Sequence, residues 1–461
     1  MCKLRVHALG NTTKVGCSSF AYELIHGGNR REIILVDLGI DPTKLPIDED
    51  DPDTLNANAL PDLEWLKANW QDVKAIFFTH CHLDHIGAVK YYFSFLERGV
   101  PIYASTFTAS MIRRELRDEH FFSPEKIDQL AKSVNINEIK YDFAELGQEI
   151  VIGGFRIVPF FVSHSTPESN GFLVQARGQA GEITNVVHLA DFKFNGLSHF
   201  PKMVVHRTLD RLSKFSIDWV VIESLYSRFD GFTPQENLVF EALFDLIMEL
   251  PHSARVIVSH FASNVARMRD VIAIAQHTGR SFAMHGRAMK DLYLLAKQHG
   301  YLEPQVYSAF EQNAEFLLVT GSQGEPYSVL SRAARGRGKP LVIDENDVVI
   351  FSSDVIPGNE QDFIDMVKAL VKRGATVYTD ERSYFPEAFA GLKVYARRNL
   401  HVSGHGTWTD KKLALKLLSP RQGAIPMHGD EHDERAFHDK AKEELGGLKT
   451  MSFLGGSIDL V

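Results

Sequence analysis

Through its first half, the chain alternates short apolar runs with segments in which apolar residues recur every three or four positions. Short apolar runs that stop at a polar residue or a glycine are typical of buried strands, and the longer spacing is typical of amphipathic helices. We therefore predict a helix over residues 86–99 that ends at Gly99. Strands are predicted over 31–37, 73–80, 151–165, 171–178, 183–192 and 218–224.

From about residue 233 the pattern changes to strands separated by helical segments. A helix over 234–250 precedes strands over 254–261, 280–286, 316–320, 347–353 and 375–380. Strands that alternate with helices are typical of a parallel sheet. The last sixty or so residues return to strand, helix and strand, and the acidic stretch 45–62 is predicted to be a solvated loop.

Length and composition narrow the class of protein. A chain of 461 residues corresponds to two domains, or to one large domain with an insertion. It has no run of eighteen apolar residues and no N-terminal signal pattern, so we expect no membrane span and no secretion. Three scattered cysteines do not make a disulfide framework, so a cytoplasmic location is expected. The net charge of −9 means that any polyanion would need a locally basic groove.

The segment 76–89, IFFTHCHLDHIGAV, places metal-seeking side chains directly after a predicted strand. Zinc is bound by neutral imidazole and carboxylate groups. His80 and His82 are two positions apart in an extended segment, so they point the same way and can bind one ion. Asp84 and His85 lie where the next helix begins and can reach a second ion. The alternative is a histidine-rich surface loop, and Cys81 should point away from both neighbours.

Two ions need more ligands, and three further residues follow apolar runs. These are His164, Asp191 and His428. Asp191 is suited to bridge two ions because a carboxylate has two oxygens. Asp37, at the end of the run 33–37, could orient a ligand or a water molecule. Each residue taken singly is readily assigned a structural role, so the prediction depends on their order after the HxHxDH motif.

This order resembles the metallo-β-lactamase fold, in which two packed sheets with helices outside carry a dinuclear site along one edge. The resemblance implies that His80, His82 and His164 hold one ion, that Asp84, His85 and His428 hold the other, and that Asp191 bridges them. It also implies two Zn²⁺ per chain, with Mn²⁺ or Mg²⁺ as alternatives. Such a pair of ions activates a water molecule for attack on a phosphodiester.

The long segment between Asp191 and His428 carries motifs of its own. Glu223-Ser224 ends a predicted strand, and four further stretches stand out: HFASNVARM (260–268), TGSQGEPYSVLSRAA (320–334), SSDVIPGNE (352–360) and HVSGHG (401–406). This series resembles the β-CASP nucleases and, within them, ribonuclease J, over nearly the whole chain. The expected fold is α/β, a metallo-β-lactamase αββα sandwich with an inserted β-CASP domain of parallel-sheet type. The expected domains are 1–230, 231–404 (β-CASP) and 405–461.

The resemblance also implies roles for individual residues. Asp84, Glu223 and His405 are the candidate catalytic residues, and His405, supported by Glu223, would protonate the departing 3′-oxygen. Ser263 and Asn264, at a predicted helix N-terminus, could hold a phosphate, or Asn264 could simply cap the helix. The loop expected to bind phosphate comprises His401, Val402, Ser403, Gly404 and His405. The basic residues expected to line an RNA cleft are Arg267, Arg287, Arg332 and Arg335.

The chain departs from the ribonuclease J pattern at a few positions. Cys81 and Leu83 stand where Gly and Glu are common, and Glu223 replaces the more usual aspartate. None of these changes removes an expected metal ligand. The sequence ends at Val461, shortly after His428, so we expect no separate C-terminal domain. Because that domain helps to assemble the tetramer of the family, a tetramer is in doubt. A homodimer through the β-CASP domain is the alternative.

The sequence therefore predicts a cytoplasmic, metal-dependent ribonuclease that binds single-stranded RNA and does not bind membranes. By resemblance, it would degrade RNA 5′→3′ from a monophosphorylated end, with endonucleolytic cleavage as a second activity. One alternative is the same chemistry on DNA or on a small ester such as a lactone. Another is a non-catalytic RNA-binding subunit that organises a complex.

Overall fold

A computed structural model describes most of the chain, and it divides into two compact units. The described residues are 3–11, 14–27, 30–41, 59–119, 121–140, 142–143, 145–178, 181–195, 203–302, 314–337, 341–356, 358–453 and 456–460. The first unit comprises Met1–Gly196, Phe200–Thr233 and Gly404–Val461, and the second is essentially Pro234–Ser403. Between Thr233 and Gly404 the chain therefore forms nearly all of the second unit and then returns to the first.

The first unit contains a seven-stranded sheet with mixed strand directions. Its order is β19-β1-β2-β3-β4-β5-β6, antiparallel from β19 to β3 and parallel from β3 to β6. The strands are β1 (Lys3–Ala8), β2 (Phe20–Ile25), β3 (Arg31–Val36), β4 (Val73–Phe77), β5 (Ile102–Ser105), β6 (Ile136–Ile139) and β19 (Ser457–Asp459).

A second, six-stranded sheet completes the sandwich of the first unit. Its order is β18-β11-β10-β9-β8-β7. Strands β10, β11 and β18 are parallel, and β8 runs in the same direction because both β8 and β10 pair antiparallel with β9. The strands are β7 (Ile150–Ile152), β8 (Phe155–Phe161), β9 (Asn170–Arg177), β10 (Ile183–His188), β11 (Trp219–Glu223) and β18 (Gly423–Met427).

The main core of the first unit lies between these two sheets. Period-two alternation places Tyr22 and Phe77 of the first sheet in one cluster with Phe155 and Phe172 of the second. Phe77 meets Phe172 edge to face, with ring centroids 5.5 Å apart. Each fully buried aromatic side chain stabilises the fold by roughly 1.5–3 kcal/mol. The two packed faces therefore fix the register of both sheets.

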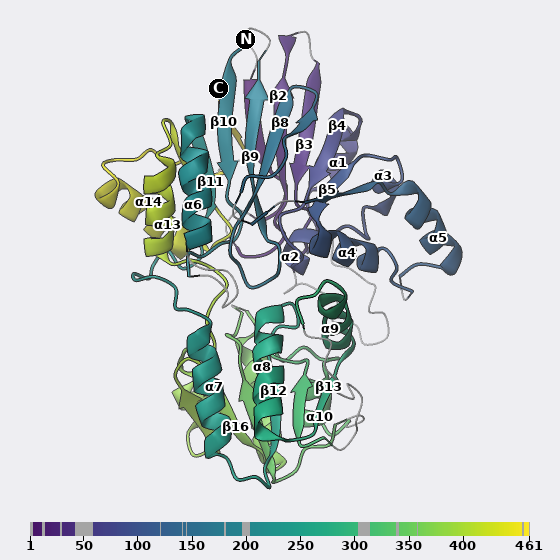
Figure 1. Cartoon of the computed structure of the whole chain (residues 1–461), viewed down its shortest axis with the longest axis vertical. Helices are drawn as coiled ribbons and strands as arrows, with labels where there is room; N and C mark the ends of the chain where they lie inside the picture. Colours follow the sequence, from purple (N-terminus) through teal and green to yellow (C-terminus); the bar gives the residue numbers. More distant parts are fainter. Residues whose placement is uncertain are drawn as a thin grey trace. The chain divides into compact units, whose positions relative to one another are not determined.

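Helices cover the outer faces of the sandwich (Figure 1). Helices α6 and α13 contact each other and, with α14, pack their apolar residues against the second sheet, forming a separate core around Trp408 and Phe437. The helices are α1 (Leu63–Asn69), α2 (Leu83–Ile86), α3 (Phe93–Leu96), α4 (Thr106–Glu115), α5 (Pro124–Ser133), α6 (Met203–Leu212), α13 (Trp408–Leu418) and α14 (Glu431–Glu444), with 3₁₀ turns η4 (Trp70–Asp72) and η5 (Ser213–Phe215).

The second unit is built on a six-stranded, wholly parallel sheet of order β13-β14-β12-β15-β16-β17, as the alternating pattern predicts. Its strands are β12 (Arg255–Ser259), β13 (Phe282–His285), β14 (Phe316–Val319), β15 (Asp347–Phe351), β16 (Thr376–Asp380) and β17 (Val394–Arg397). Its helices are α7 (Asn237–Glu249), α8 (Val265–Thr278), α9 (Arg287–Gln298), α10 (Val329–Ala334), α11 (Glu360–Lys372) and α12 (Pro386–Phe389), with the 3₁₀ turn η6 (Glu381–Ser383).

The predicted helix over 86–99 is wrong. Only α2 and α3 are helical in this region, and turns join them. The reason lies in the backbone hydrogen bonds. Ala88 N donates to Leu38 O, while Asp84 O accepts from Ser18 N, so the helical bond between Asp84 and Ala88 is not made. Backbone from two earlier segments thus competes for these groups and ends the helix after one turn.

Two further expectations concern loops and membranes. The acidic stretch 45–62 lies outside the described residues as far as position 58, so the expected solvated loop is not described there. Within the described ranges, every helix is too short or too polar to cross a bilayer.

Candidate metal centre and acid–histidine pair

The candidate residues of the first unit follow the carboxyl ends of parallel strands. His80 and His82 follow β4, His164 follows β8, Asp191 follows β10 and His428 follows β18. Because parallel strands end at the same edge of a sheet, these loops meet. Sharp turns aim the side chains there, since Asp37, Ala190 and His428 have positive φ angles of 63°, 58° and 49°. A non-glycine residue in this conformation costs of order 1–3 kcal/mol, which the surrounding fold must offset.

The first group of side chains is formed by His80, His82 and His164, here called the three-histidine group. Their ligand atoms lie within 4.8 Å of one another. His82 Nδ1 is 3.0 Å from His80 Nε2 and 3.1 Å from His164 Nε2. His80 is fully buried and His164 is 1% exposed. Three imidazole nitrogens thus converge on one point, although residues 78–82 form a loop instead of the expected extended strand.

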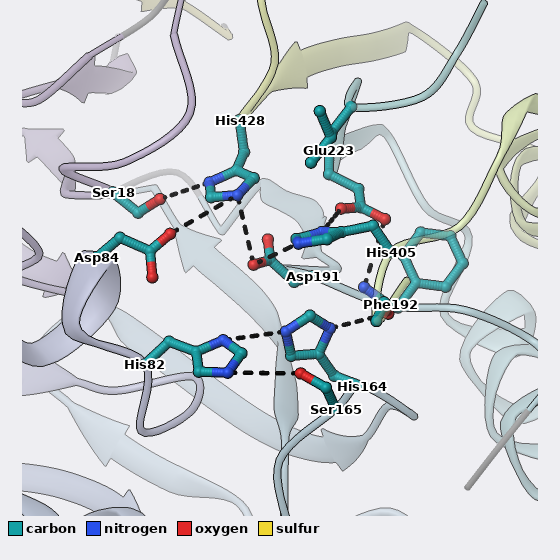
Figure 2. Close-up of polar contacts among 12 residues, drawn as sticks. Ser18, His82, Asp84, His164, Ser165, Asp191, Phe192, Glu223, His405 and His428 are labelled. Carbon is teal, nitrogen blue, oxygen red and sulfur yellow. Dashed lines mark hydrogen bonds and ion pairs between the residues drawn. The ribbon is translucent and has the colours of Figure 1, made fainter. Parts of the chain in front are cut away.

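The second group, here called the Asp191 group, contains Asp84, His85, Asp191 and His428, again with ligand atoms within 4.8 Å. Asp191 Oδ2 lies 3.1 Å from His85 Nε2. It lies 3.6 Å from His428 Nε2, and Figure 2 shows this contact. The same oxygen is 3.7 Å from His80 Nε2, so Asp191 lies between the two groups. All seven side chains that the sequence singles out as ligands therefore meet at this edge.

The protons on the imidazole rings are directed away from the meeting point. His164 Nδ1 donates to Gly404 O at 2.9 Å, and His85 Nδ1 donates to Asp37 Oδ2 at 2.7 Å. Their Nε2 atoms, which face the cluster, are therefore free to act as ligands. His428 Nε2 and Asp191 Oδ1 are buried and have no hydrogen-bond partner among the described residues. Unpaired buried polar atoms are costly, so this donor set fits divalent metal ions.

The electrostatics of the cluster favour neutral imidazoles in the three-histidine group. Burial, together with the neighbouring imidazoles, lowers the pKa of His80 and His164 well below the ordinary value. Burial also lowers the pKa of His82, to about 4. For His85, burial opposes the charge, but Asp191, Asp84 and Asp37 raise its pKa well above normal. The Asp191 group is thus the more strongly anionic half, which suits a second cation.

A buried acid–histidine pair lies beside the cluster. Glu223, the last residue of β11, is fully buried, and its Oε2 accepts a hydrogen bond from His405 Nδ1 at 2.5 Å (Figure 2). Burial opposes a charge on His405, but Glu223 and Asp191 raise its pKa above the ordinary value. His405 Nδ1 is 3.9 Å from Asp191 Oδ2, so the pair adjoins both groups. A carboxylate that holds an imidazole in this way is an arrangement typical of proton transfer.

The expected phosphate loop divides between the two units. Gly404 and His405 belong to the first, and His401, Val402 and Ser403 to the second. In the second unit, His401 N donates to Asp380 Oδ2 at 3.0 Å. In the first, a β-carbon at position 404 would lie 2.8 Å from His164 Cε1, so only glycine fits there.

Two residues of the second unit that the sequence marks as nucleic-acid contacts, Asn264 and Arg267, hold structural positions. Asn264 caps helix α8, with its side-chain oxygen accepting from Arg267 N at 3.0 Å, and Ser263 precedes this cap. Arg267 is completely buried, and its guanidinium pairs with Glu236 Oε2 at 2.6 Å. The expectation that Arg267 lines an RNA cleft is therefore wrong, because its charge is already used inside the unit. Arg287, by contrast, is exposed, with 59% of its side-chain surface accessible.

Sequence reasoning missed two residues that orient the candidate ligands. Ser18 Oγ lies 3.0 Å from His428 Nδ1, although the two residues are 410 positions apart. Thr79 Oγ1 donates to Asp37 Oδ2 at 2.7 Å and lies 3.0 Å from His80 Nδ1. The position of Thr79 beside the HxHxDH motif could have pointed to its role. Nothing in the local pattern around Ser18 does so.

Two family models match the chain. Residues 13–162 match the metallo-beta-lactamase superfamily, and residues 253–370 match the model described as "Ribonuclease J, beta-CASP domain". The first match contains most of the candidate ligands, and the second covers most of the parallel-sheet unit. Together they confirm the expected fold class.

Relatives and a solved structure agree with these matches. Ribonuclease J of Mycobacterium tuberculosis H37Rv is 30% identical over 99% of this chain and 75% of its own length. Ribonuclease J2 of Bacillus subtilis is 28% identical over the same shares. A solved structure of a protein of unknown function from Enterococcus faecalis V583 has the same fold, with a TM-score of 0.62, 16% identity and coverage of 99% of this chain and 100% of that one. The chain belongs to the ribonuclease J family, whose metallo-β-lactamase and β-CASP domains it contains.

Proposed function

We propose that this chain is a metal-dependent ribonuclease that hydrolyses RNA phosphodiesters at the edge where its two packed sheets meet. The observation that carries the proposal is the convergence of seven ligand side chains that follow the ends of β4, β8, β10 and β18, with the Glu223–His405 pair beside them. Membership of the ribonuclease J family supports RNA as the substrate.

In this proposal, the three-histidine group holds one divalent ion, Asp84, His85 and His428 hold a second, and Asp191 is shared. Bound together, two such ions make a water molecule acidic and stabilise negative charge on the attacking and leaving oxygens. Zinc suits a donor set rich in imidazole, and manganese accepts the same ligands. Asp37 and Ser18 keep the rings of His85 and His428 correctly oriented. The side chain of Asp84 is 18% exposed, so it is the ligand carboxylate best placed to orient an incoming water.

The chain's own residues supply the proton for the leaving group. Because Glu223 holds His405 Nδ1, we assign the proton transfer to Nε2 of the same ring. Protonation of the departing 3′-oxygen by a positioned imidazole typically contributes about 10²- to 10⁴-fold to the rate. The side chain of His405 is 18% exposed, so it remains accessible from solvent.

The finer features of the proposal follow from the family resemblance. Cleavage would proceed 5′→3′ from a monophosphorylated end, with the loop 401–405 binding a phosphate and endonucleolytic cleavage as a second activity. The enzyme would act in the cytoplasm, and two copies would associate through the second unit. These features predict mononucleotides as the main product.

The experiment is digestion of a long RNA labelled at a monophosphorylated 5′ end, beside a DNA of the same sequence and a lactone. Release of labelled mononucleotides from the RNA supports the exonuclease proposal, and labelled 5′-terminal fragments several nucleotides long indicate endonuclease activity. Hydrolysis of the DNA or the lactone with the RNA left intact would refute the ribonuclease proposal. Metal analysis adds a second criterion, because fewer than about one ion per chain would favour a non-catalytic RNA-binding subunit.

The Glu223→Gln variant tests the proposed proton donor separately from the metal centre. The substitution keeps the shape of the side chain but removes the carboxylate that orients His405. We expect kcat to fall by about 100-fold or more, with the bound-metal content unchanged. A variant that loses its metal together with its activity would show that Glu223 serves the metal centre instead.

A further inference from the structure

Lys411 is a buried cation in an unusual place. Its side chain is completely excluded from solvent, and it lies in the first turn of α13, which begins at Trp408. Burial of a charge is costly unless it is paired. The N-terminus of a helix also carries a partial positive charge, so a lysine there is disfavoured a second time. A compensating interaction must therefore offset both costs.

Three oxygens surround the ammonium group. Lys411 Nζ donates to Leu225 O at 2.8 Å and to Gly406 O. It also lies 3.6 Å from Oε1 of Glu223, which is itself fully buried. Leu225 and Gly406 directly flank the acid–histidine pair in sequence, two residues after Glu223 and one residue after His405. Lys411 thus connects the backbone on both sides of the pair to the carboxylate at its centre.

The two oxygens of Glu223 have separate partners. Oε1 accepts from Gly406 N at 3.1 Å and from Phe192 N at 3.5 Å, and it faces Lys411. Oε2 accepts from His405 Nδ1. Because Oε1 is engaged on one side, the carboxylate cannot rotate without losing these contacts. Oε2 is therefore held where the imidazole of His405 meets it.

We propose that Lys411 is a positioning residue for the leaving-group proton donor, acting on His405 through Glu223. The inference rests on the proposed ribonuclease activity, since it concerns the same site. Among the described residues, Lys411 is the only cation that faces Oε1 of Glu223. Without the ammonium group, this buried carboxylate would lose that neighbour. It would then rotate, and the orientation of His405 would relax. A small misplacement of a catalytic group lowers the rate of the chemical step more than it affects binding.

A purely structural role is the alternative, in which Lys411 only ties Leu225 and Gly406 together. The two roles differ in how they depend on Glu223. If Lys411 acts through the carboxylate, its removal has little further effect once Glu223 is already neutral. If it only joins two loops, its removal has the same effect in either background.

The test is a double-mutant cycle with Lys411→Met and Glu223→Gln, measured on a 5′-monophosphorylated RNA oligonucleotide with Zn²⁺ or Mn²⁺. We expect Lys411→Met to lower kcat by about 10- to 100-fold, with KM and the bound-metal content within about twofold of the wild type. In the Glu223→Gln background, the same substitution should change kcat by less than about threefold. Equal losses in both backgrounds, or an unchanged kcat in Lys411→Met, would overturn the proposal.

The double variant also guards against misfolding. It removes both buried charges together, so neither is left unpaired if Lys411→Met alone does not fold. In that case, the test compares kcat of the double variant with kcat of Glu223→Gln alone. A further loss of tenfold or more in the double variant would refute a role of Lys411 through the carboxylate. Arg255→Met is the matched control, since it breaks the Arg255–Asp347 ion pair in the second unit. Its kcat should remain within about twofold of the wild type while its melting temperature falls. A wild-type chain that cleaves no RNA would refute the proposed function itself, and with it this role.

Discussion

Both units place histidines at the ends of strands, but they use them differently. In the first unit, imidazoles converge with Asp84 and Asp191 to form groups that could hold a metal ion. In the second, His260 follows β12 and His285 ends β13, yet the described residues of this unit form no such group. The number of histidines is therefore not what makes a site. What distinguishes the first unit is that its rings converge, three of them on one another and others on the carboxylates of Asp84 and Asp191.

The electrostatics of the two units differ in the same way. Burial lowers the pKa of His260 to about 3 and also lowers that of His285. At His260 the carboxylate of Glu236 raises the pKa too little to offset burial and Arg267, whereas Asp191 and Asp84 raise the pKa of His85 well above normal. Burial thus keeps His260 and His285 neutral, and neither belongs to a group of described residues that could hold a metal ion. The principal buried charges of the second unit, Arg267 and Glu236, pair with each other.

The largest effect should come from removing the carboxylate that joins the two groups. Asp191→Asn keeps the size of the side chain but removes its charge from a site with six other proposed ligands. We expect a loss of bound metal and a fall in RNA cleavage of at least about 1000-fold, because two-metal sites supply several kcal/mol of transition-state stabilisation. Metal analysis and single-turnover cleavage measure the two effects.

Asp270→Asn is the matched control for this prediction. Asp270 is also a buried aspartate, but it lies on α8 in the second unit, 3.6 Å from Arg269 and away from any group that could hold a metal. Its variant should keep its metal and its activity within about twofold. If both aspartate variants lost activity equally, the contrast between the units would fail.

The next effect should be a loss of stability when the buried pair of the second unit is broken. Arg267 pairs with Glu236 at 2.6 Å and donates to Ser352 O at 3.1 Å and to Leu400 O at 3.3 Å. Arg267→Met leaves the carboxylate of Glu236 buried without its cation, which typically costs about 3–5 kcal/mol. Urea unfolding followed by circular dichroism should show this loss in the free energy of unfolding.

A double variant separates the lost charge from the lost packing. Combining Arg267→Met with Glu236→Gln removes the uncompensated charge, so the double variant should be more stable than Arg267→Met alone. A double variant that is less stable than Arg267→Met alone would contradict the view that an unpaired carboxylate is the main cost.

The sequence could predict much of the site because most of its residues come just after parallel strands. His80, His164, Asp191 and His428 each directly follow an apolar run, and parallel strands bring such positions to one edge whatever their separation in the chain. These strand ends predict the seven converging side chains only together with the order of the residues after the HxHxDH motif and the family resemblance of that order. They do not reveal Lys411, whose position in the first turn of a helix gives no local sign that it would face Glu223.

The errors also have physical causes. A helix that continued from α2 through 86–99 would need the bond from Ala88 N to Asp84 O, but hydrogen bonds from Ser18 and to Leu38 take both groups. A surface position is the expectation for Arg267 because arginines usually stay in water. Its partner Glu236 lies 31 residues earlier, and only the tertiary fold brings the two together. Long-range competition and long-range pairing are what local patterns omit.

The smallest effects should appear in the pH dependence of stability, where two buried groups of the second unit act in opposite directions. His260 has a pKa of about 3 in the folded chain, because burial lowers it and Arg267 outweighs Glu236 among its charged neighbours. From about pH 6.5 down to 3, the unfolded chain binds a proton that the folded chain does not. His260 therefore lowers the free energy of unfolding by about 1.4 kcal/mol per pH unit as the pH falls.

Asp270 has the opposite sign. Burial raises its pKa to about 6, although Arg267 and Arg269 act to lower it. Between about pH 6 and 3.8 the folded chain binds the extra proton, so this carboxyl stabilises the fold as the pH falls and destabilises it above pH 6. Relative to the wild type, His260→Asn should thus gain stability toward pH 4.5 and Asp270→Asn toward pH 7.5. Urea unfolding at both pH values measures the two differences. The titrating histidines of the first unit are common to all three proteins, so their contributions cancel in these differences. If each variant differed from the wild type by the same free energy of unfolding at both pH values, His260 and Asp270 would not be buried as described.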